Sequence, residues 1–328
     1  MRRWGVALVF LAGLALGQNQ AEFALRLEQA WRLVKERYYD PNFKGVDWAQ
    51  VGQAYRYRLG EVKSWEELYR LLDEMYGELN DGHSRVLSPA QARSLGGQAC
   101  QPLPFKDQDL LPLPSPPTAP PYLPPPPKPL PQAPALGLGD FEAQLLQGVV
   151  VIRLGNLLES QGPALLRQAV RRYEPQARGY LLDLRDNPGG LVLHMAEAAG
   201  VFMRGVPWRL VGRGLGAVPL PTLPFLGPPT TQKPLAVLIN GQTHSAAEGL
   251  AGALKNARRA YLVGTRSAGN TEALVPYCFP DGGVALVAAG VLAPLSGPTW
   301  EGRGVEPDQV EERPEAQLEA ALRHLRQR

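Results

Sequence analysis

Cysteine and histidine are scarce in this chain of 328 residues, which holds only two of the first and four of the second. The histidines are scattered and the cysteines lie far apart, so no cluster has metal-ligand spacing and we expect neither a metal nor another cofactor. The formal net charge is also small, at +3, and gives no reason to expect a nucleic acid as partner. These shortages argue against a metalloenzyme and against a nucleic-acid-binding protein.

Hydrophobic residues make up 45% of the chain and charged residues 20%, which is typical of a globular protein with a sizeable core. Both values argue against a wholly disordered chain and against a polytopic membrane protein. The length is sufficient for about two domains. Glycine and proline are plentiful, with 35 and 33 residues, and many of the prolines lie in one tract.

The first 17 residues have the pattern of a secretory signal. Arg2 and Arg3 precede an apolar run from Trp4 to Gly17 that ends in small residues, which predicts cleavage before Gln18. A membrane anchor is the alternative, but about 20 apolar residues are needed to span a bilayer. We therefore expect an exported protein that is periplasmic, in the cell envelope or secreted. Membrane association is expected only if the signal is not cleaved.

Residues 18–95 contain three amphipathic segments, at about 21–39, 47–59 and 64–79. The third begins after Ser64, which forms a capping box with Glu67. Three such helices with short joints predict a small helical bundle, and a polar turn from Asn80 to Ser84 ends it.

A proline-rich segment follows at residues 96–137. Between Gln101 and Pro134, 15 of 34 residues are proline, which excludes helix and central strand and predicts an extended linker. A ligand for a proline-binding partner is the less favoured interpretation. Cys100 lies at the start of this segment and Cys278 lies 178 residues later. In an oxidising compartment the two form either a disulfide or a pair of small buried thiols, and both remain open.

From residue 138 to 328, short apolar runs alternate with amphipathic segments. Expected strands lie at 149–154, 180–184, 235–239, 261–263 and 284–289, and expected helices at 160–173, 191–202, 245–256 and 314–326. The glycine- and proline-rich residues 205–231 are expected as connections. Repeated strand–helix units of this kind predict an α/β layered core.

Ser245 lies where an expected strand has ended and a helix begins. A serine hydroxyl there gains from the partial positive charge of the helix end, and the amide of Ala246 is placed to stabilise an oxyanion. The alternative is a capping box, with Ser245 as N-cap and Glu248 returning its bond. Taken alone, this motif favours capping.

A glycine pair, Gly189-Gly190, follows the buried strand that ends near Leu184. Two glycines let another segment or a ligand come close to the backbone and let the backbone amides point at it, which suits a donor to an oxyanion. A tight turn needs glycine too, and the spacing of a dinucleotide site is missing.

His83, in the polar turn, is the best available general base among the four histidines. His194 lies inside a helix, His324 in the terminal helix, and His244 beside Ser245, where adjacent side chains point apart. A surface histidine without function is the alternative for His83.

Taken together, these motifs resemble the tail-specific, or C-terminal processing, serine peptidases, in that family's order and spacing across most of residues 20–310. The similar stretches are Leu79–Ser84, Asp183–Gly190, Thr243–Glu248, Arg259–Gly264, Ser267–Asn270 and Gly302–Asp308. The resemblance implies a ClpP/crotonase-like ββα core with an N-terminal three-helix bundle. It also implies Ser245 as nucleophile and Ala246 with Gly189 or Gly190 as the oxyanion hole.

Two departures from the family pattern matter. Many members carry a peptide-binding PDZ domain where this chain has only the proline tract. The family's lysine base lies 25 residues after the serine, and that position is Asn270, whose amide cannot take a proton at neutral pH. Tricorn-like relatives instead use a histidine that matches His83 and a glutamate that Glu301 matches. The serine before their histidine is Gly82 here, unless Ser84 replaces it.

We therefore expect an exported serine endopeptidase that hydrolyses proteins or peptides. His83 removes the proton of Ser245, and Glu301 orients the imidazole or a nearby water. The alternative is a catalytically silent module that binds peptide or lipid on the same scaffold. A structural envelope protein tethered by the proline tract is a third hypothesis.

Overall fold

The computed structural model describes residues 4–94, 99–122, 141–213 and 216–327, with the backbone alone for residues 4–18. The chain divides into two compact units, which are described separately. The first comprises residues up to 131 together with 274–289, and the second comprises 132–273 and 290–328. Two parts of the predicted linker, residues 96–98 and 123–137, lie outside the described residues.

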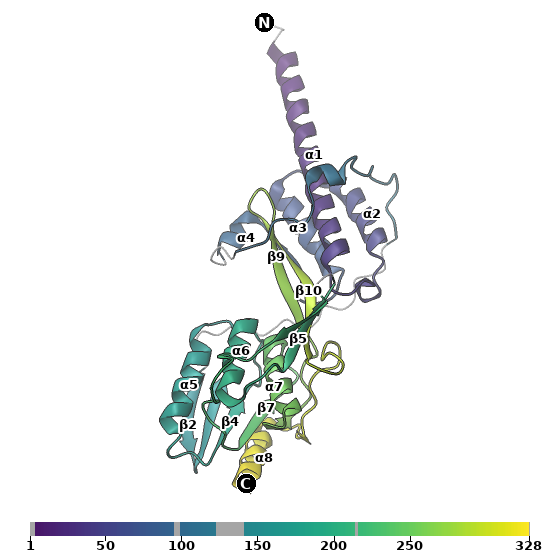
Figure 1. Cartoon of the computed structure of the whole chain (residues 1–328). Helices are drawn as coiled ribbons and strands as arrows, with labels where there is room; N and C mark the ends of the chain where they lie inside the picture. Colours follow the sequence, from purple (N-terminus) through teal and green to yellow (C-terminus); the bar gives the residue numbers. More distant parts are fainter. Residues whose placement is uncertain (1–3, 95–98, 123–140, 214–215, 328) are drawn as a thin grey trace. The chain divides into compact units, whose positions relative to one another are not determined.

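The first unit is built on three helices that share one core. They are α1 (Trp4–Arg37), α2 (Trp48–Arg58) and α3 (Trp65–Gly77) (Figure 1). Ser64 caps α3, because its Oγ accepts a hydrogen bond from the Glu67 amide at 3.2 Å. Among the residues whose placement is described, no helix is long and apolar enough to cross a membrane. Short elements complete the N-terminal part of this unit: η1 (Phe43–Gly45), η2 (Leu59–Glu61), β1 (Arg85–Leu87), α4 (Pro89–Ser94) and η3 (Asp107–Leu110).

A hairpin from late in the chain completes the first unit. Its strands are β9 (Glu272–Cys278) and β10 (Val284–Pro294), and the core residues Tyr277 and Phe279 pack among the helices. Two further links hold the hairpin. Arg26 is buried and bonds Asp281 at 2.5 Å, and a disulfide joins Cys278 to Cys100. The structure thus has the disulfide rather than two thiols.

The second unit is an α/β sandwich around a six-stranded sheet. The strand order is β11-β8-β7-β4-β3-β2, with only β2 antiparallel to its neighbour. The strands are β2 (Phe141–Leu146), β3 (Val149–Leu154), β4 (Gly179–Asp183), β7 (Leu235–Ile239), β8 (Tyr261–Gly264) and β11 (Gln309–Val310).

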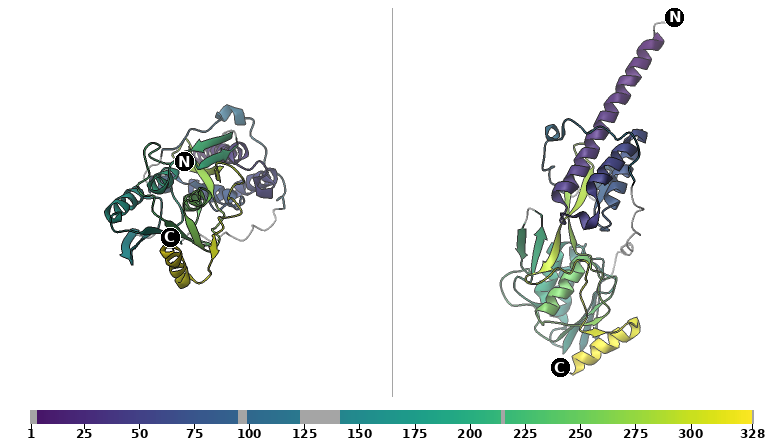
Figure 2. Two further views of the ribbon diagram at one scale, coloured as in Figure 1. Left: turned by 60° about the horizontal axis from the view of Figure 1, so that its bottom comes forward. Right: turned by 90° about the vertical axis from the view of Figure 1, so that its right-hand side faces the viewer.

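Alternate residues of the central strands point to opposite faces of this sheet. One face packs against three helices, α5 (Gln161–Tyr173), α6 (Val192–Phe202) and α7 (Ser245–Asn256). The other face packs against α8 (Pro314–Arg326), near the C-terminal end of the chain (Figure 2). In β7, for example, Val237 belongs to the first layer and Leu238 to the second.

A smaller antiparallel layer flanks the sandwich. It consists of β5 (Trp208–Gly212), β6 (Gly216–Leu220) and the end of β10, whose Gly290–Pro294 pairs with β5. The predicted α/β class is confirmed, and four predicted elements have the observed bounds: β3, β7, α7 and α8. The expectation of mere connections across 205–231 is wrong, because β5 and β6 lie there.

Candidate active site

Ser245 is the first residue of α7 and has a strained backbone. Its φ is 52°, in the left-handed region that costs a non-glycine residue about 1–2 kcal/mol. The N-cap is His244, so Ser245 does not cap the helix. The Ser245 hydroxyl has no hydrogen bond to any residue that the structure describes, and the side chain is half-buried. Capping therefore does not explain this hydroxyl.

Glu248 does make its expected bond, and three more. Its buried carboxylate accepts hydrogen bonds from the amide of Ser245 at 3.0 Å and from the amide of Asn270 at 2.9 Å. The other carboxylate oxygen accepts from the Ser267 hydroxyl and the Gly269 amide, both at 2.6 Å. Burial raises the pKa of the Glu248 carboxyl, although these hydrogen bonds act in the opposite direction. Glu248 thus ties the start of α7 to residues 267–270.

Asn270 lies directly against the backbone of Ser245, because its carbonyl oxygen accepts a hydrogen bond from the Ser245 amide at 2.9 Å. The position where the resembling family has lysine is therefore beside the candidate nucleophile. A carboxamide has no basic nitrogen, so a serine–lysine pair does not form here.

The glycine pair meets the start of α7 through Gly189. Its φ is 89°, and a Cβ there would come within 2.7 Å of the Ser245 Cβ and 2.9 Å of the Ala246 nitrogen. Only glycine fits this approach without displacing the serine. Asn187 fixes the turn, because its side chain accepts from the Gly189 amide at 2.8 Å and its carbonyl accepts from the His244 amide at 2.9 Å.

Two amides remain without a partner at this place. Neither the Gly190 amide nor the Ala246 amide donates to a residue in the described parts of the chain. Gly190 is held by Leu157, whose amide donates to the Gly189 carbonyl at 2.8 Å and whose carbonyl accepts from the Leu191 amide at 2.9 Å. Of the two glycines, Gly190 therefore has the amide that is available to a ligand, because that of Gly189 is engaged.

Glu301 reaches the same neighbourhood through Thr271. Its carboxylate accepts a hydrogen bond from the Thr271 amide at 2.6 Å, and Thr271 follows Asn270 directly. The second unit thus brings together five of the six predicted site residues: Ser245, Ala246, Gly189, Gly190 and Glu301.

His83, the sixth, belongs to the first unit. Asp81 shapes its turn by accepting hydrogen bonds from the amides of His83 at 2.8 Å and Ser84 at 2.7 Å. In the second unit, His194 is buried and its Nδ1 lies 2.9 Å from the Leu157 carbonyl. His244 contributes its backbone as the N-cap of α7.

Sequence reasoning missed two residues that organise the site. Asn187 and Thr271 are both buried, and each links two segments that are distant in the sequence. The side-chain Nδ2 of Asn187 donates to the Leu154 carbonyl at 2.6 Å. The available signal for Asn187 was its place in the turn that follows the buried strand β4, because a buried amide must find partners.

Comparison with known proteins supplies the class and the family. The model for Peptidase family S41 matches residues 148–310, and that for the Tricorn protease C1 domain matches residues 19–77. A carboxy-terminal-processing protease of Bartonella bacilliformis is 39% identical over 143 residues, which is 42% of this chain and 32% of that protein. A carboxyl-terminal-processing protease of Picosynechococcus is 26% identical over 359 residues, covering 87% of this chain and 82% of the relative.

Solved structures show the same fold. A lipoprotein from Streptococcus agalactiae aligns with a TM-score of 0.67 and 17% identity, over 93% of this chain and 96% of that one. The photosystem II D1 C-terminal processing protease aligns with a TM-score of 0.62 and 20% identity, over 88% and 93%.

The α/β fold and these relatives define a serine-type peptidase, a hydrolase of peptide bonds in proteins or peptides. Residues 148–310 are a peptidase domain of family S41, and residues 19–77 are a tricorn-type C1 segment.

Proposed function

We propose that Ser245 is the nucleophile of this peptidase and that His83 is its general base. The observation that carries the proposal is the contact between Ser245 and Gly189 beside the unpartnered Ala246 amide. A strained residue at the start of a buried helix presents its hydroxyl while the helix end favours developing negative charge. Asn270 cannot act as base, so the proton acceptor must be another residue.

In this mechanism Ser245 attacks the peptide carbonyl as its proton passes to His83. The amides of Ala246 and Gly190 then bind the oxyanion, and Gly189 serves as the spacer that lets the two approach. Losing one such donor costs about 3–4 kcal/mol in transition-state stabilisation. Glu301 orients the imidazole or a water from its position on Thr271.

We also infer an exported enzyme that acts on the carboxyl-terminal region of its substrates. Export is supported by the basic and apolar N-terminal pattern and by the Cys100–Cys278 disulfide, which suits an oxidising compartment. The carboxyl-terminal preference is supported by the names of the relatives that match most of the chain. The predicted division into signal, bundle, linker and core remains a proposal.

The test is labelling with a fluorophosphonate probe between pH 6 and 9. We expect the probe to label the unaltered chain at Ser245, to fail on Ser245→Ala, and to react far more slowly with His83→Ala. His324→Ala, a histidine of α8, is the matched control and should react like the unaltered chain. Absence of labelling, with a peptide bound equally well by Ser245→Ala, would instead support the silent binding module.

A further inference from the structure

The second unit holds a pocket of about 430 Å³ that the proposed mechanism does not use, and we call it the sheet-edge pocket. It lies where the parallel strands β7 and β8 begin, beside the last turns of α7 and α8. Its volume falls in the range of small-ligand sites. Ser245 follows the other end of β7, and the five residues of that strand span about 16 Å. A molecule in the sheet-edge pocket would therefore be separate from the reacting groups.

Basic side chains outnumber acidic ones in the lining of this pocket. The lining includes Lys255, Arg258 and Arg259 but only one carboxylate, that of Asp308. Lys255 pairs with this carboxylate, because its Nζ lies 3.4 Å from Asp308 Oδ1. The same Nζ donates to the Glu306 carbonyl at 2.6 Å. Two guanidinium groups are therefore left without a carboxylate from the lining.

Arg259 is a half-buried cation that donates hydrogen bonds only to neutral groups. Its Nε donates to the Phe202 carbonyl at 2.8 Å, and its Nη2 donates to the carbonyls of Thr231 at 3.3 Å and Lys233 at 2.9 Å. No carboxylate in the described parts of the chain lies within ion-pair distance of it. Burial lowers the pKa of the Arg259 guanidinium, and Glu174 offsets this effect only in part. A bound anion would supply the missing counter-charge.

Arg258 occupies a backbone position that commonly belongs to glycine. Its φ is 52°, and the amides of Arg258 and Arg259 donate to the carbonyls of Lys255 at 2.8 Å and Leu254 at 2.9 Å. These two bonds form the Schellman motif that ends α7, in which the left-handed residue is usually glycine. The exposed Arg258 side chain makes no hydrogen bond or ion pair with any residue that the structure describes. Neither the turn nor an internal contact therefore requires an arginine here.

Aromatic and apolar groups complete the wall of the sheet-edge pocket. The rings of Tyr261 and His324 stack with their centroids 3.7 Å apart and an angle of 3° between the ring planes. Pro234, Leu235 and Leu325 add apolar surface. A phosphate group alone would fill only part of a cavity of about 430 Å³. The remaining space suits an organic group against this wall.

We propose that the sheet-edge pocket binds a phosphate monoester, with Arg258 and Arg259 on the phosphate and the organic group on the wall around Tyr261. Guanidinium groups match phosphate oxygens with parallel N–H donors, and Nη1 of Arg259 makes none of the three bonds described above. A phosphate monoester carries about two negative charges at neutral pH, which balance two guanidinium groups. A carboxylate would balance only one of them. The proposal does not depend on the proposed function.

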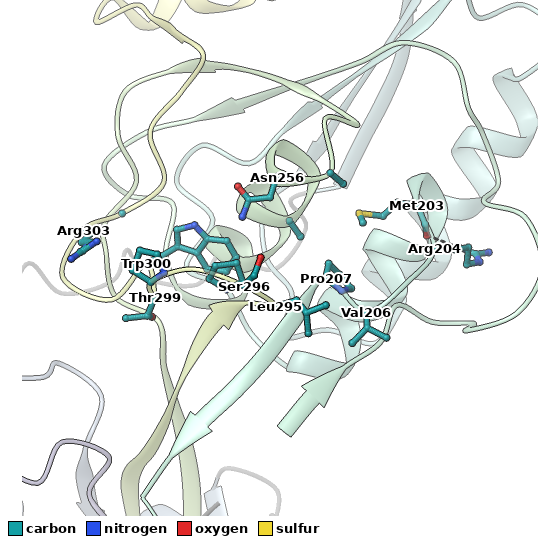
Figure 3. Close-up of a pocket in the computed structure, with 15 residues that line it drawn as sticks. Met203, Arg204, Val206, Pro207, Asn256, Leu295, Ser296, Thr299, Trp300 and Arg303 are labelled. Carbon is teal, nitrogen blue, oxygen red and sulfur yellow. Dashed lines mark hydrogen bonds between the residues drawn. The ribbon is translucent and has the colours of Figure 1, made fainter. Parts of the chain in front are cut away.

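The test measures binding of phenyl phosphate to the full-length chain by isothermal titration calorimetry. Benzyl alcohol offers the ring without a charge, and benzoate offers the ring with a single negative charge. Arg258→Gln removes the cation that makes no internal contact. Arg303→Gln is the matched control, because Arg303 is also exposed but lines a different pocket, where α6 and α7 end (Figure 3).

We expect phenyl phosphate to bind and Arg258→Gln to weaken it about 10- to 100-fold, as for the loss of a charged hydrogen bond. Arg303→Gln should leave the affinity unchanged. Absence of binding, or unchanged affinity in Arg258→Gln, would overturn the proposal. Benzoate or benzyl alcohol bound as tightly as phenyl phosphate would also overturn it, because the pocket would then not select a phosphate.

Arg258→Gly separates a binding role from a structural one. Glycine adopts the left-handed conformation without the steric cost that arginine bears. This variant should therefore melt at or above the temperature of the unaltered chain, measured by circular dichroism, and still lose affinity for phenyl phosphate. If Arg258→Gly and Arg258→Gln both melted well below the unaltered chain, the side chain would serve the fold and the proposal would be wrong.

Cosedimentation with vesicles distinguishes the two sources of a phosphate monoester, a soluble molecule and a lipid headgroup. The vesicles consist of phosphatidylcholine with or without phosphatidic acid. Sedimentation that needs phosphatidic acid and is lost in Arg258→Gln would support a lipid headgroup. Binding of phenyl phosphate without such sedimentation would support a soluble ester. Because the probe binds away from Ser245, a failure of this test is separate from a failure of fluorophosphonate labelling.

Discussion

Replacement of Gly189 by alanine is the sharpest test of the candidate site. The new Cβ would lie 2.7 Å from the Ser245 Cβ, 2.8 Å from the His244 carbonyl oxygen and 2.9 Å from the Ala246 nitrogen. Two of these neighbours are backbone atoms at the start of a buried helix, so Ser245 and the Ala246 amide must shift. A shifted oxyanion donor costs about 3–4 kcal/mol, so we expect turnover of a peptide substrate to fall by about 10²- to 10³-fold.

Gly227→Ala separates this effect from backbone strain. Gly227 has a φ of 86° against 89° for Gly189, and nothing lies within 4 Å of a Cβ there. Both variants should lose about 1–2 kcal/mol of unfolding free energy from the left-handed conformation. Only Gly189→Ala should also lose activity, as measured by initial rates and by the rate of fluorophosphonate labelling. If the two variants kept activity alike within threefold, the assignment of Gly189 to the site would be refuted.

Three further predictions concern groups that hold the structure. Glu248→Gln replaces one acceptor oxygen by an NH2 group. With that group facing Ser245 and Asn270, the Asn270 amide loses its acceptor at about 1–3 kcal/mol, whereas the Ser245 amide still donates to the Asn270 carbonyl. Removal of a buried charge whose pKa burial has raised partly offsets this cost, so we expect urea unfolding to show a net loss of about 1–2 kcal/mol. Burial opposes ionisation of Asp281, but hydrogen bonds from Tyr69 and Arg26 outweigh it and hold the pKa of that carboxyl below its ordinary value of 3.8. The ionised Asp281 carboxylate therefore stabilises the folded chain at pH values above 3.8, and this stabilisation is lost as the pH falls through the lower pKa of the folded state. Unfolding curves measured across this acidic range should show a weaker pH dependence for Asp281→Asn than for the unaltered chain. Replacing both Cys100 and Cys278 by serine opens a loop of 178 residues and should cost about 5 kcal/mol in the chain-entropy model; a melting temperature equal to that of the oxidised chain would contradict this.

The sequence predicts best those elements that local pattern alone determines. The buried strand β7 and helix α8 have the expected bounds, because a short apolar run and an amphipathic face with a first-turn proline are complete signals. Strand β6 was missed because it contains Pro219 and only its last residue is even partly buried. The strand forms because it pairs with β5, and this tertiary contact cannot be predicted from the residues of β6 alone.

The candidate site divides in the same way. Ser245 and the glycine pair follow strands of one sheet, so their neighbourhood could be expected from topology and resemblance. The sequence could not predict that the available amide belongs to Gly190 and not to Gly189. This depends on the hydrogen bond that the Gly189 amide donates to the Asn187 side chain, which no residue spacing reveals. The link from Glu301 to Thr271 crosses 30 residues and likewise follows only from tertiary packing.

Residues 274–289 belong to the first unit, although the residues on both sides of them belong to the second. Neither unit can therefore be expressed whole as one continuous segment of the chain. A truncated chain that starts after the proline tract would retain Tyr277, Phe279 and Val287 without the helices that bury them. Such a fragment would expose these apolar side chains to water, and we expect it to aggregate. A chimera that takes one unit from a relative therefore needs three junctions, after residues 131, 273 and 289.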